Sequence, residues 1–138
     1  MRTYKFRGKR LDDVWVYGSL VIGTDGEKTY IFTRDGAQWS VDPETVGQCT
    51  GLKDKNGVEI YEGDIYRLTN LSLGRFCSQE RYVNDQVVFI GGQFTCRNWN
   101  IRESYGEVIG NVWEDGELLN DSQIPKTDRN YKQLPSNL

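Results

Sequence analysis

The sequence predicts a mainly β protein: a small barrel or sandwich of short antiparallel strands, followed by a flexible polar C-terminal tail. Runs of β-branched and aromatic residues alternate with Gly, Asn and Asp about every 8–12 residues, which is typical of such folds. No helical apolar period continues for about ten residues. A chain of 138 residues is long enough for one domain with its own core. We therefore expect a single β domain over residues 1–119 and a polar tail over residues 120–138.

Strand signals dominate the first third of the chain. Runs rich in β-branched and aromatic residues are separated by Gly- and Asp-containing turns, and we expect strands at residues 14–22, 28–32 and 38–41. Pro43 follows Asp42, and this pair favours either a single helical turn or a loop over residues 42–45.

Turn chemistry is concentrated between residues 53 and 65. Asn56-Gly57 is typical of a type I′ hairpin turn, in which both central residues need a positive φ. Gly63 supplies a second turn before an alternating strand at residues 65–68, and Asp64 is expected to accept hydrogen bonds from local N–H groups. We therefore assign structural roles in turns to Asn56, Gly57, Gly63 and Asp64.

The second half of the chain gives weaker and more scattered signals. Residues 69–86 indicate a long loop or an excursion, with some strand character from Tyr82. Gly91-Gly92 indicates a two-residue hairpin turn between strands at residues 87–90 and 93–97. A last strand is expected within residues 105–113, followed by a helical turn at residues 117–119.

The composition excludes several classes of catalytic site. The chain has no histidine, which excludes Ser-His-Asp triads, Cys-His pairs and His-ligated zinc. The densest carboxylate group is Glu59, Glu62 and Asp64. Carboxylates of this kind serve acid–base catalysis or bind Mg²⁺ and Ca²⁺, but their position between two strands favours a structural role. We expect no enzyme activity and no catalytic, cofactor or metal site.

Cysteine usage and hydropathy predict a cytoplasmic protein. The cysteines at positions 49, 77 and 96 lack CxxC spacing, and an odd number does not make a disulfide framework. Reduced, mostly buried thiols are the expectation. The basic N-terminus is followed by no apolar segment of the signal-peptide kind, and no run approaches the length of a membrane span.

Charge is distributed unevenly along the chain. Residues 1–10 hold five bases and no acid, whereas residues 11–66 hold four bases and eleven acids. Since the net charge is −3, we expect the basic segments to pair with acidic segments, within the chain or across a subunit contact. The alternative is a nucleic-acid surface in which aromatic rings stack on bases and arginines bind phosphates. Its candidate residues are Arg67, Arg97, Trp99 and Arg102.

Three segments carry a resemblance to a known family. They are YKFR at residues 4–7, TGLKDKNG followed by EIYEGDI within residues 50–65, and VIGN followed by acidic residues and LL within residues 108–119. The middle segment is the most specific of the three. Together they resemble the YopX protein family, encoded mainly by phages and prophages, over residues 2–119. The chain departs from the family pattern at Gly8 and Lys9, and its residues 67–104 match no part of that pattern.

The resemblance implies a mainly β fold and a mobile-element setting, and it implies no established activity or catalytic residue. Short strands leave open edges, and pairing these edges across subunits satisfies their backbone groups. We therefore expect a non-enzymatic binding or assembly module that forms a homo-oligomer or binds a phage or host protein. A nucleic-acid-binding barrel is the alternative, and a carboxylate-based hydrolase is a third hypothesis.

Overall fold

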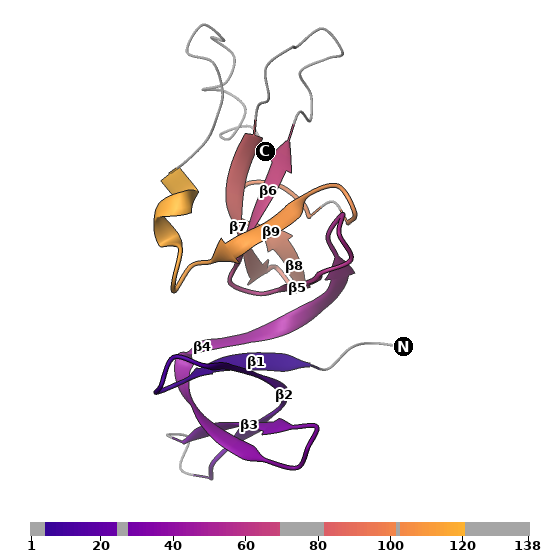
Figure 1. The fold of residues 1–138 in the computed structure, drawn as a ribbon. Helices are drawn as coiled ribbons and strands as arrows, with labels where there is room; N and C mark the ends of the chain where they lie inside the picture. Colours follow the sequence, from indigo (N-terminus) through magenta and orange to yellow (C-terminus); the bar gives the residue numbers. More distant parts are fainter. Residues whose placement is uncertain (1–4, 25–27, 70–81, 102, 121–138) are drawn as a thin grey trace, which may run out of the picture. The chain divides into compact units, whose positions relative to one another are not determined.

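The computed structural model describes residues 5–24, 28–69, 82–101 and 103–120. These residues form β-strands and one short 3₁₀ helix, so the predicted mainly β class is confirmed (Figure 1). The chain divides into two compact units: unit 1 is residues 1–52 and 59–62, and unit 2 is residues 53–58 and 63–138. The expectation of one domain over residues 1–119 stays a prediction. The predicted tail lies outside the described residues from residue 121 onward.

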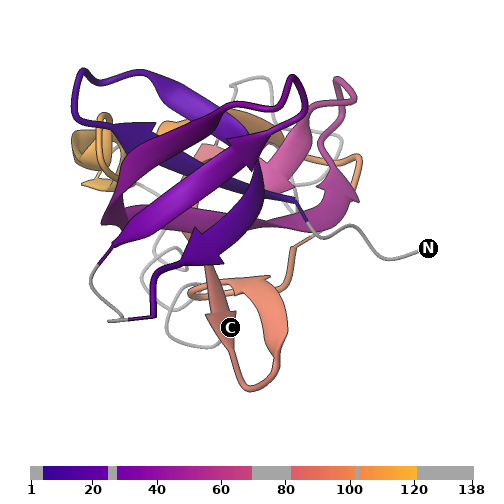
Figure 2. The ribbon, with the colours of Figure 1, turned by 90° about the horizontal axis from the view of Figure 1, so that it is seen from below.

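Unit 1 is an antiparallel sheet that closes on itself. Its strands follow the order β1-β2-β3-β4-β5, and β1 also pairs with β4. Strands β1 to β4 therefore form the small barrel that the sequence predicts, and β5 extends the sheet beside β4 (Figures 1 and 2). The strands are β1 (Phe6–Arg10), β2 (Trp15–Ile22), β3 (Thr29–Thr33), β4 (Gln38–Lys53) and β5 (Glu59–Tyr61).

The interior of unit 1 is filled by alternate residues of these strands. Val16, Ile31 and Val41 are buried at its centre, each from a different strand. Gly8 makes room for Val41, because a Cβ atom at Gly8 would lie 2.8 Å from Val41 Cγ2. The surrounding, partly buried residues are Phe6, Leu20, Trp39 and Val46.

Two features of unit 1 differ from the sequence-based expectations. No strand was expected at residues 6–10, where the structure has β1. Residues 42–45 form neither a helical turn nor a loop but lie within β4. The register of β4 against β1 shifts there, so that Arg7 is opposite Gly47 and Lys9 is opposite Asp42. The extra residues bend the strand, which lets β4 pair with β3 at one end and with β1 further along.

Unit 2 is a four-stranded antiparallel sheet in the order β8-β7-β6-β9. Gly91 and Gly92, with φ of 64° and 81°, form the predicted two-residue turn between β7 and β8, and Figure 2 shows this hairpin in salmon. β7 begins at Tyr82, where strand character was expected. The predicted loop over residues 69–86 is wrong at Thr69, which belongs to β6, and at residues 84–86, which belong to β7; residues 70–81 lie outside the described part. The elements are β6 (Asp64–Thr69), β7 (Tyr82–Ile90), β8 (Gln93–Cys96), β9 (Glu107–Asn111) and the 3₁₀ helix η1 (Gly116–Asn120).

Polar groups inside unit 2 are held by backbone contacts. The buried Tyr66 hydroxyl accepts a hydrogen bond from Gly106 N at 2.9 Å, and burial raises the pKa of this phenol. Asp85 accepts a hydrogen bond from Asn98 N at 2.7 Å, and burial raises the pKa of its carboxyl. These contacts fix the chain segments that precede β9 and follow β8.

Two of the three cysteines lie in the described residues and agree with the expectation of buried thiols. Cys49 and Cys96 are free and buried, and burial raises the pKa of the Cys96 thiol. Cys77 lies outside the described residues. Among the helices of the described ranges, none has the length and apolar character needed to cross a membrane.

Candidate functional site

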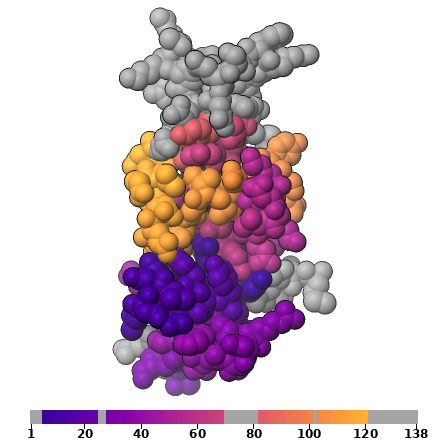
Figure 3. Space-filling model, in the orientation of Figure 1, coloured from indigo at the N-terminus to yellow at the C-terminus, as the bar shows by residue number. Residues whose placement is uncertain are grey.

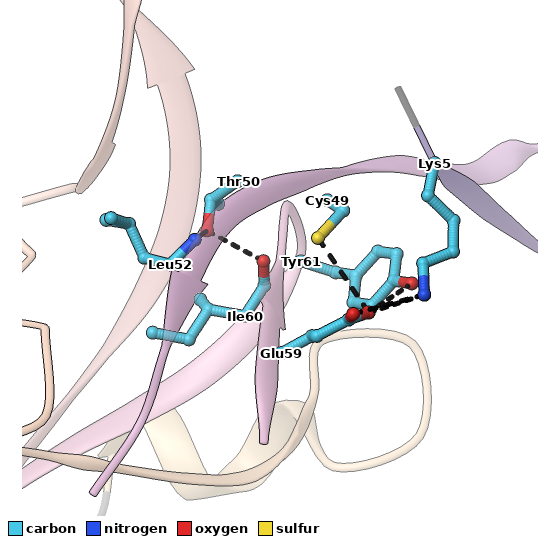
Figure 4. A network of polar contacts seen from close by, with 7 residues as sticks. All are labelled: Lys5, Cys49, Thr50, Leu52, Glu59, Ile60 and Tyr61. Carbon is cyan, nitrogen blue, oxygen red and sulfur yellow. Dashed lines mark hydrogen bonds and ion pairs between the residues drawn. The ribbon is translucent and has the colours of Figure 1, made fainter. Parts of the chain in front are cut away.

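A polar network around Glu59 anchors the last strand of unit 1 (Figure 4). Lys5 Nζ lies 2.8 Å from Glu59 Oε2 and donates to Oε1 at 3.1 Å. The Tyr61 hydroxyl donates to Glu59 Oε2 at 3.2 Å, and Cys49 Sγ lies 3.9 Å from the same oxygen. The carboxylate is thus neutralised by a cation and fixes the phenol beside it.

A second set of contacts in the same view ties β5 to β4. Thr50 Oγ1 donates to the Ile60 carbonyl at 2.8 Å and accepts from Leu52 N at 3.1 Å (Figure 4). Glu62 N donates to the Gln48 carbonyl at 2.9 Å. Tyr61 is therefore held both by its backbone and by its hydroxyl.

Burial raises the pKa of the Tyr61 phenol above its ordinary value of 10.0, and the nearby Cys49 and Glu59 reinforce the shift. The phenol is neutral at physiological pH, which is the state that donates a hydrogen bond to a carboxylate. A neutral phenol that donates to a salt-bridged carboxylate joins β5 to the N-terminal segment through Lys5.

The raised pKa of Tyr61 has a consequence for stability at alkaline pH. Above about pH 10 the unfolded chain loses the phenolic proton that the folded protein keeps, so the free energy of unfolding is expected to fall by about 1 kcal/mol per pH unit. Urea unfolding at neutral and alkaline pH measures this slope. Tyr61→Phe is expected to flatten it, leaving the contributions of Tyr66 and Cys96; an unchanged slope would contradict the assignment.

The Arg7 guanidinium lies buried between two aromatic rings. Its Cζ atom is 5.0 Å from the centre of the Trp15 ring and 4.9 Å from that of Tyr61, and Nη2 donates to the Glu62 carbonyl at 3.4 Å. The Tyr61 ring meets the Tyr17 ring edge-on at 5.6 Å between centroids. Desolvated cation–π contacts contribute about 2 kcal/mol, so this stack holds Tyr17 in one orientation at the surface.

Tyr17 belongs to a surface that carries no charge, called the outer face below. Side chains alternate along β2, β3 and the start of β4, so one set fills the barrel and the other points outward. Ser19 is opposite Phe32 and Val21 opposite Tyr30 across the β2–β3 pair. The members of the outer face are Tyr17, Ser19, Val21, Tyr30, Phe32, Gln38 and Ser40.

The composition of the outer face distinguishes it from the rest of the chain. Charged residues make up 27% of the sequence, and none is among these seven, although the next alternate position of β4 is the exposed Asp42 and Arg7 lies opposite Tyr17. Tyr17 and Phe32 keep 46% and 45% of their surface exposed. Depletion of charge together with exposed aromatic rings is the signature of the centre of a protein–protein interface.

The basic N-terminal segment pairs within unit 1, as the charge distribution predicts. Lys5 pairs with Glu59, and Lys9 Nζ lies 3.5 Å from Asp13 Oδ1. Arg10 pairs with Asp12, and its guanidinium lies 4.1 Å from the centre of the Trp39 ring. Each of these three cations therefore has an acidic neighbour from residues 11–66.

Arg67 and Trp99, two of the four candidate nucleic-acid residues, have different surroundings. Arg67 Nε donates to Asn84 Oδ1 at 2.9 Å, and its Cζ atom lies 3.7 Å from the centre of the Tyr82 ring. The Trp99 ring lies 6.3 Å from the Tyr66 ring. Tyr66 and Arg67 are neighbours in β6, so their side chains leave opposite faces of the sheet.

The other two candidates are Arg97 and Arg102. Arg97 is exposed and pairs through its backbone N–H with the Gln86 carbonyl at 3.0 Å. Arg102 lies outside the described residues. Trp99 therefore packs on one face of the sheet while Arg67 is engaged on the other.

The predicted type I′ turn at Asn56-Gly57 is wrong in one respect. Gly57 has φ of 81°, but Asn56 is not among the described residues with positive φ, which besides glycines are Asp13 and Ser104. The buried Asp54 explains the difference: its Oδ1 accepts from Asn56 N at 2.8 Å and from Val58 N at 2.9 Å. Gly57 N also donates to the Asp54 carbonyl at 3.0 Å. Asp is a common first residue of turns, and here its side chain caps the N–H groups of the hairpin.

Gly63 and Asp64 lie where β5 leads into β6. Gly63 has φ of 91° and joins β5 to β6. Asp64 begins β6 and is 1% exposed. Glu62 Oε1 lies 3.5 Å from Gln48 N, whereas Glu59 pairs with Lys5 and Asp64 is buried. The three carboxylates of the predicted group therefore have different neighbours. Within the described ranges, no three His, Cys, Asp or Glu side chains are arranged to hold a metal ion.

Comparison with known proteins places the chain in a family. The model of the family described as YopX protein matches residues 5–120. No curated protein matches the chain. A similar solved structure is the crystal structure of protein EF1440 from Enterococcus faecalis, with 21% identity and a TM-score of 0.53 over 86% of this chain and 99% of that one. This likeness shows a shared fold, and the family match shows that the chain belongs to the YopX protein family.

Proposed function

We propose that this chain is a non-enzymatic binding and assembly module, encoded by a phage or prophage and acting in the cytoplasm, whose partner is a second copy of itself. The outer face is the observation that carries the proposal: an uncharged, partly aromatic surface on a chain rich in charged residues. A phage or host protein is the alternative partner for the same face.

Charge favours self-association through this surface. Each chain carries a net charge of −3, so two copies repel unless they meet where no charge is buried. A two-fold contact places the same patch against itself, and an uncharged patch is compatible with its own copy. The Tyr17 ring already contacts the Tyr61 ring, which is itself stacked against Arg7, and this contact lowers the entropy that Tyr17 loses on binding.

Nucleic acid is a poor match for the same surface. Binding to phosphates needs unpaired cations, and the outer face has none. Lys5, Lys9 and Arg10 lie beside carboxylates. A sub-micromolar affinity for DNA or RNA at physiological salt would therefore contradict the proposal.

Sedimentation equilibrium of the full chain at about 1 to 50 µM tests it, a range that covers typical stable interfaces. The wild type is expected to sediment above its monomer mass. Phe32→Lys is expected to raise the dissociation constant about tenfold or more, because it removes a central aromatic ring and buries a charge. Ser19→Lys, directly across from Phe32, is expected to do the same without removing apolar surface.

Leu11→Lys is the matched control. Leu11 is 89% exposed and lies in the turn before β2, so it is an apolar-to-lysine change in unit 1 that leaves the outer face intact. Its mass distribution is expected to equal that of the wild type. A wild type that stays monomeric, or equal effects of Leu11→Lys and Phe32→Lys, would overturn the proposal.

A further inference from the structure

The two edges of the unit 2 sheet are treated differently. At one edge, β9 is covered by carboxylates: Val108 N donates to Asp54 Oδ2 at 3.0 Å, and Asn111 N donates to Asp115 Oδ2 at 3.1 Å. The Lys55 N–H also donates to the Gly106 carbonyl at 2.9 Å. Figure 3 shows the orange atoms around β9 beside the magenta atoms of the turn around residues 53–58. This edge has no row of open backbone groups for a further strand.

The other edge, β8, lacks such protection among the described residues. It pairs with β7 alone. Its sequence, Gln93-Phe-Thr-Cys96, contains neither a charged residue nor proline, the usual means by which natural edge strands block pairing. Nothing in the composition of β8 therefore opposes the addition of a strand.

The turn geometry fixes which backbone groups point outward from β8. In a two-residue type I′ hairpin the residues that flank the turn, here Ile90 and Gln93, form a hydrogen-bonded pair, and the next pair does not. The next pair is Phe89 and Phe94. The N–H and C=O groups of Phe94 consequently point away from β7, toward the open edge.

Apolar side chains gather beside this edge. The rings of Phe89 and Phe94 meet edge-on at 4.9 Å between centroids. Phe89 and Ile90 keep 52% and 51% of their surface exposed. A strand added to β8 would bury part of this surface while it satisfied the Phe94 backbone.

We propose that β8 pairs antiparallel with β8 of a second copy, around a two-fold axis that passes between the two Phe94 residues. Each Phe94 N–H donates to the Phe94 carbonyl of the other copy, and the two four-stranded sheets become one. The two Phe89–Phe94 pairs then meet on one face, and cross-strand aromatic pairs of this kind stabilise sheets. Because β8 is uncharged, two copies bring no like charges together there.

This contact rests on the proposed self-assembly but uses unit 2, whereas the outer face belongs to unit 1. Two such contacts on one chain build assemblies larger than a dimer. Loss of either contact alone is expected to leave the other in place, so each proposal can be tested independently of the other.

Disulfide trapping in the full chain tests the strand pairing directly. In a hydrogen-bonded antiparallel pair the two Cα atoms are about 5.5 Å apart, which is within disulfide range. Phe94→Cys is therefore expected to give a covalent dimer under mild oxidation. Thr95→Cys is the matched control, because it lies off the axis and faces Gln93 of the other copy in this register. Equal rates of cross-linking for the two variants would overturn the pairing.

Phe94→Pro tests the same contact without a cross-link. Proline removes only the N–H that faces the open edge, so pairing with β7 is retained. The variant is expected to sediment at a lower mass than Phe94→Ala, which keeps the N–H and loses the ring. If Phe94→Cys fails to cross-link while Phe32→Lys still lowers the mass, the β8 contact is wrong and the outer face stands. If Phe94→Cys cross-links while Phe32→Lys changes nothing, the outer face is wrong and the β8 contact stands.

Discussion

Gly63→Ala is expected to lower the free energy of unfolding by about 2–4 kcal/mol, the range of severe single substitutions. Gly63 has φ of 91°, and a Cβ atom there would lie 2.2 Å from Cη2 of the Trp113 ring. The backbone has no room to move, because Gly63 N donates to the Val87 carbonyl at 2.8 Å and its own carbonyl accepts from Val112 N at 3.0 Å. Urea unfolding at neutral pH measures the loss.

Gly57→Ala separates the two causes of this loss. Gly57 has φ of 81°, but nothing lies within 4 Å of its hypothetical Cβ atom. Only the backbone strain of about 1–2 kcal/mol is therefore expected. The difference between the two variants measures the displacement of Trp113, and equal losses would show that the ring moves aside without cost.

Asp54→Ala is expected to cost about 3 kcal/mol, because three N–H groups lose their acceptor and each hydrogen bond contributes roughly 0.5–1.5 kcal/mol. The Asp54 side chain, in a residue that is 3% exposed, accepts from the N–H groups of Asn56, Val58 and Val108. Removing it loosens the hairpin and uncovers the edge of β9. Thermal unfolding followed by circular dichroism measures the effect.

Asn56→Ala is the comparison for this variant. The type I′ expectation makes Asn56 costly to replace, because alanine is strained at positive φ. The structure places no positive φ at Asn56 and gives its side chain one exposed contact, at 3.5 Å to Glu107. A change of less than about 0.5 kcal/mol is therefore expected, as at ordinary surface sites. A loss as large as that of Asp54→Ala would restore the earlier expectation.

Local signals predicted the strands that short-range chemistry determines. The Gly91-Gly92 turn needed no partner to be recognised, because two adjacent glycines supply both positive φ angles. The alternating run at residues 65–68 became part of β6, and the helical turn at residues 117–119 became part of η1. In each case neighbouring residues carry the information.

Local sequence signals did not predict β1 or the full length of β4. Lys5, Arg7 and Lys9 obscure the alternation of β1, whose strand form depends on pairing with both β2 and β4. Pro43 indicates a break, yet the register shift against β1 absorbs the extra residues inside one long strand. Pairing between segments far apart in sequence decided both.

The sequence by itself determined the mainly β class, the absence of histidine chemistry, the hairpin at Gly91-Gly92 and the family, because composition, local turn geometry and contiguous motifs carry these properties. Only the tertiary structure decided that Arg7 lies buried between Trp15 and Tyr61, that the uncharged positions of β2, β3 and β4 align on one outer face, and that β9 is covered while β8 is open. These features depend on which strands pair and in which register, and a shift of one residue would reverse every inward and outward side chain.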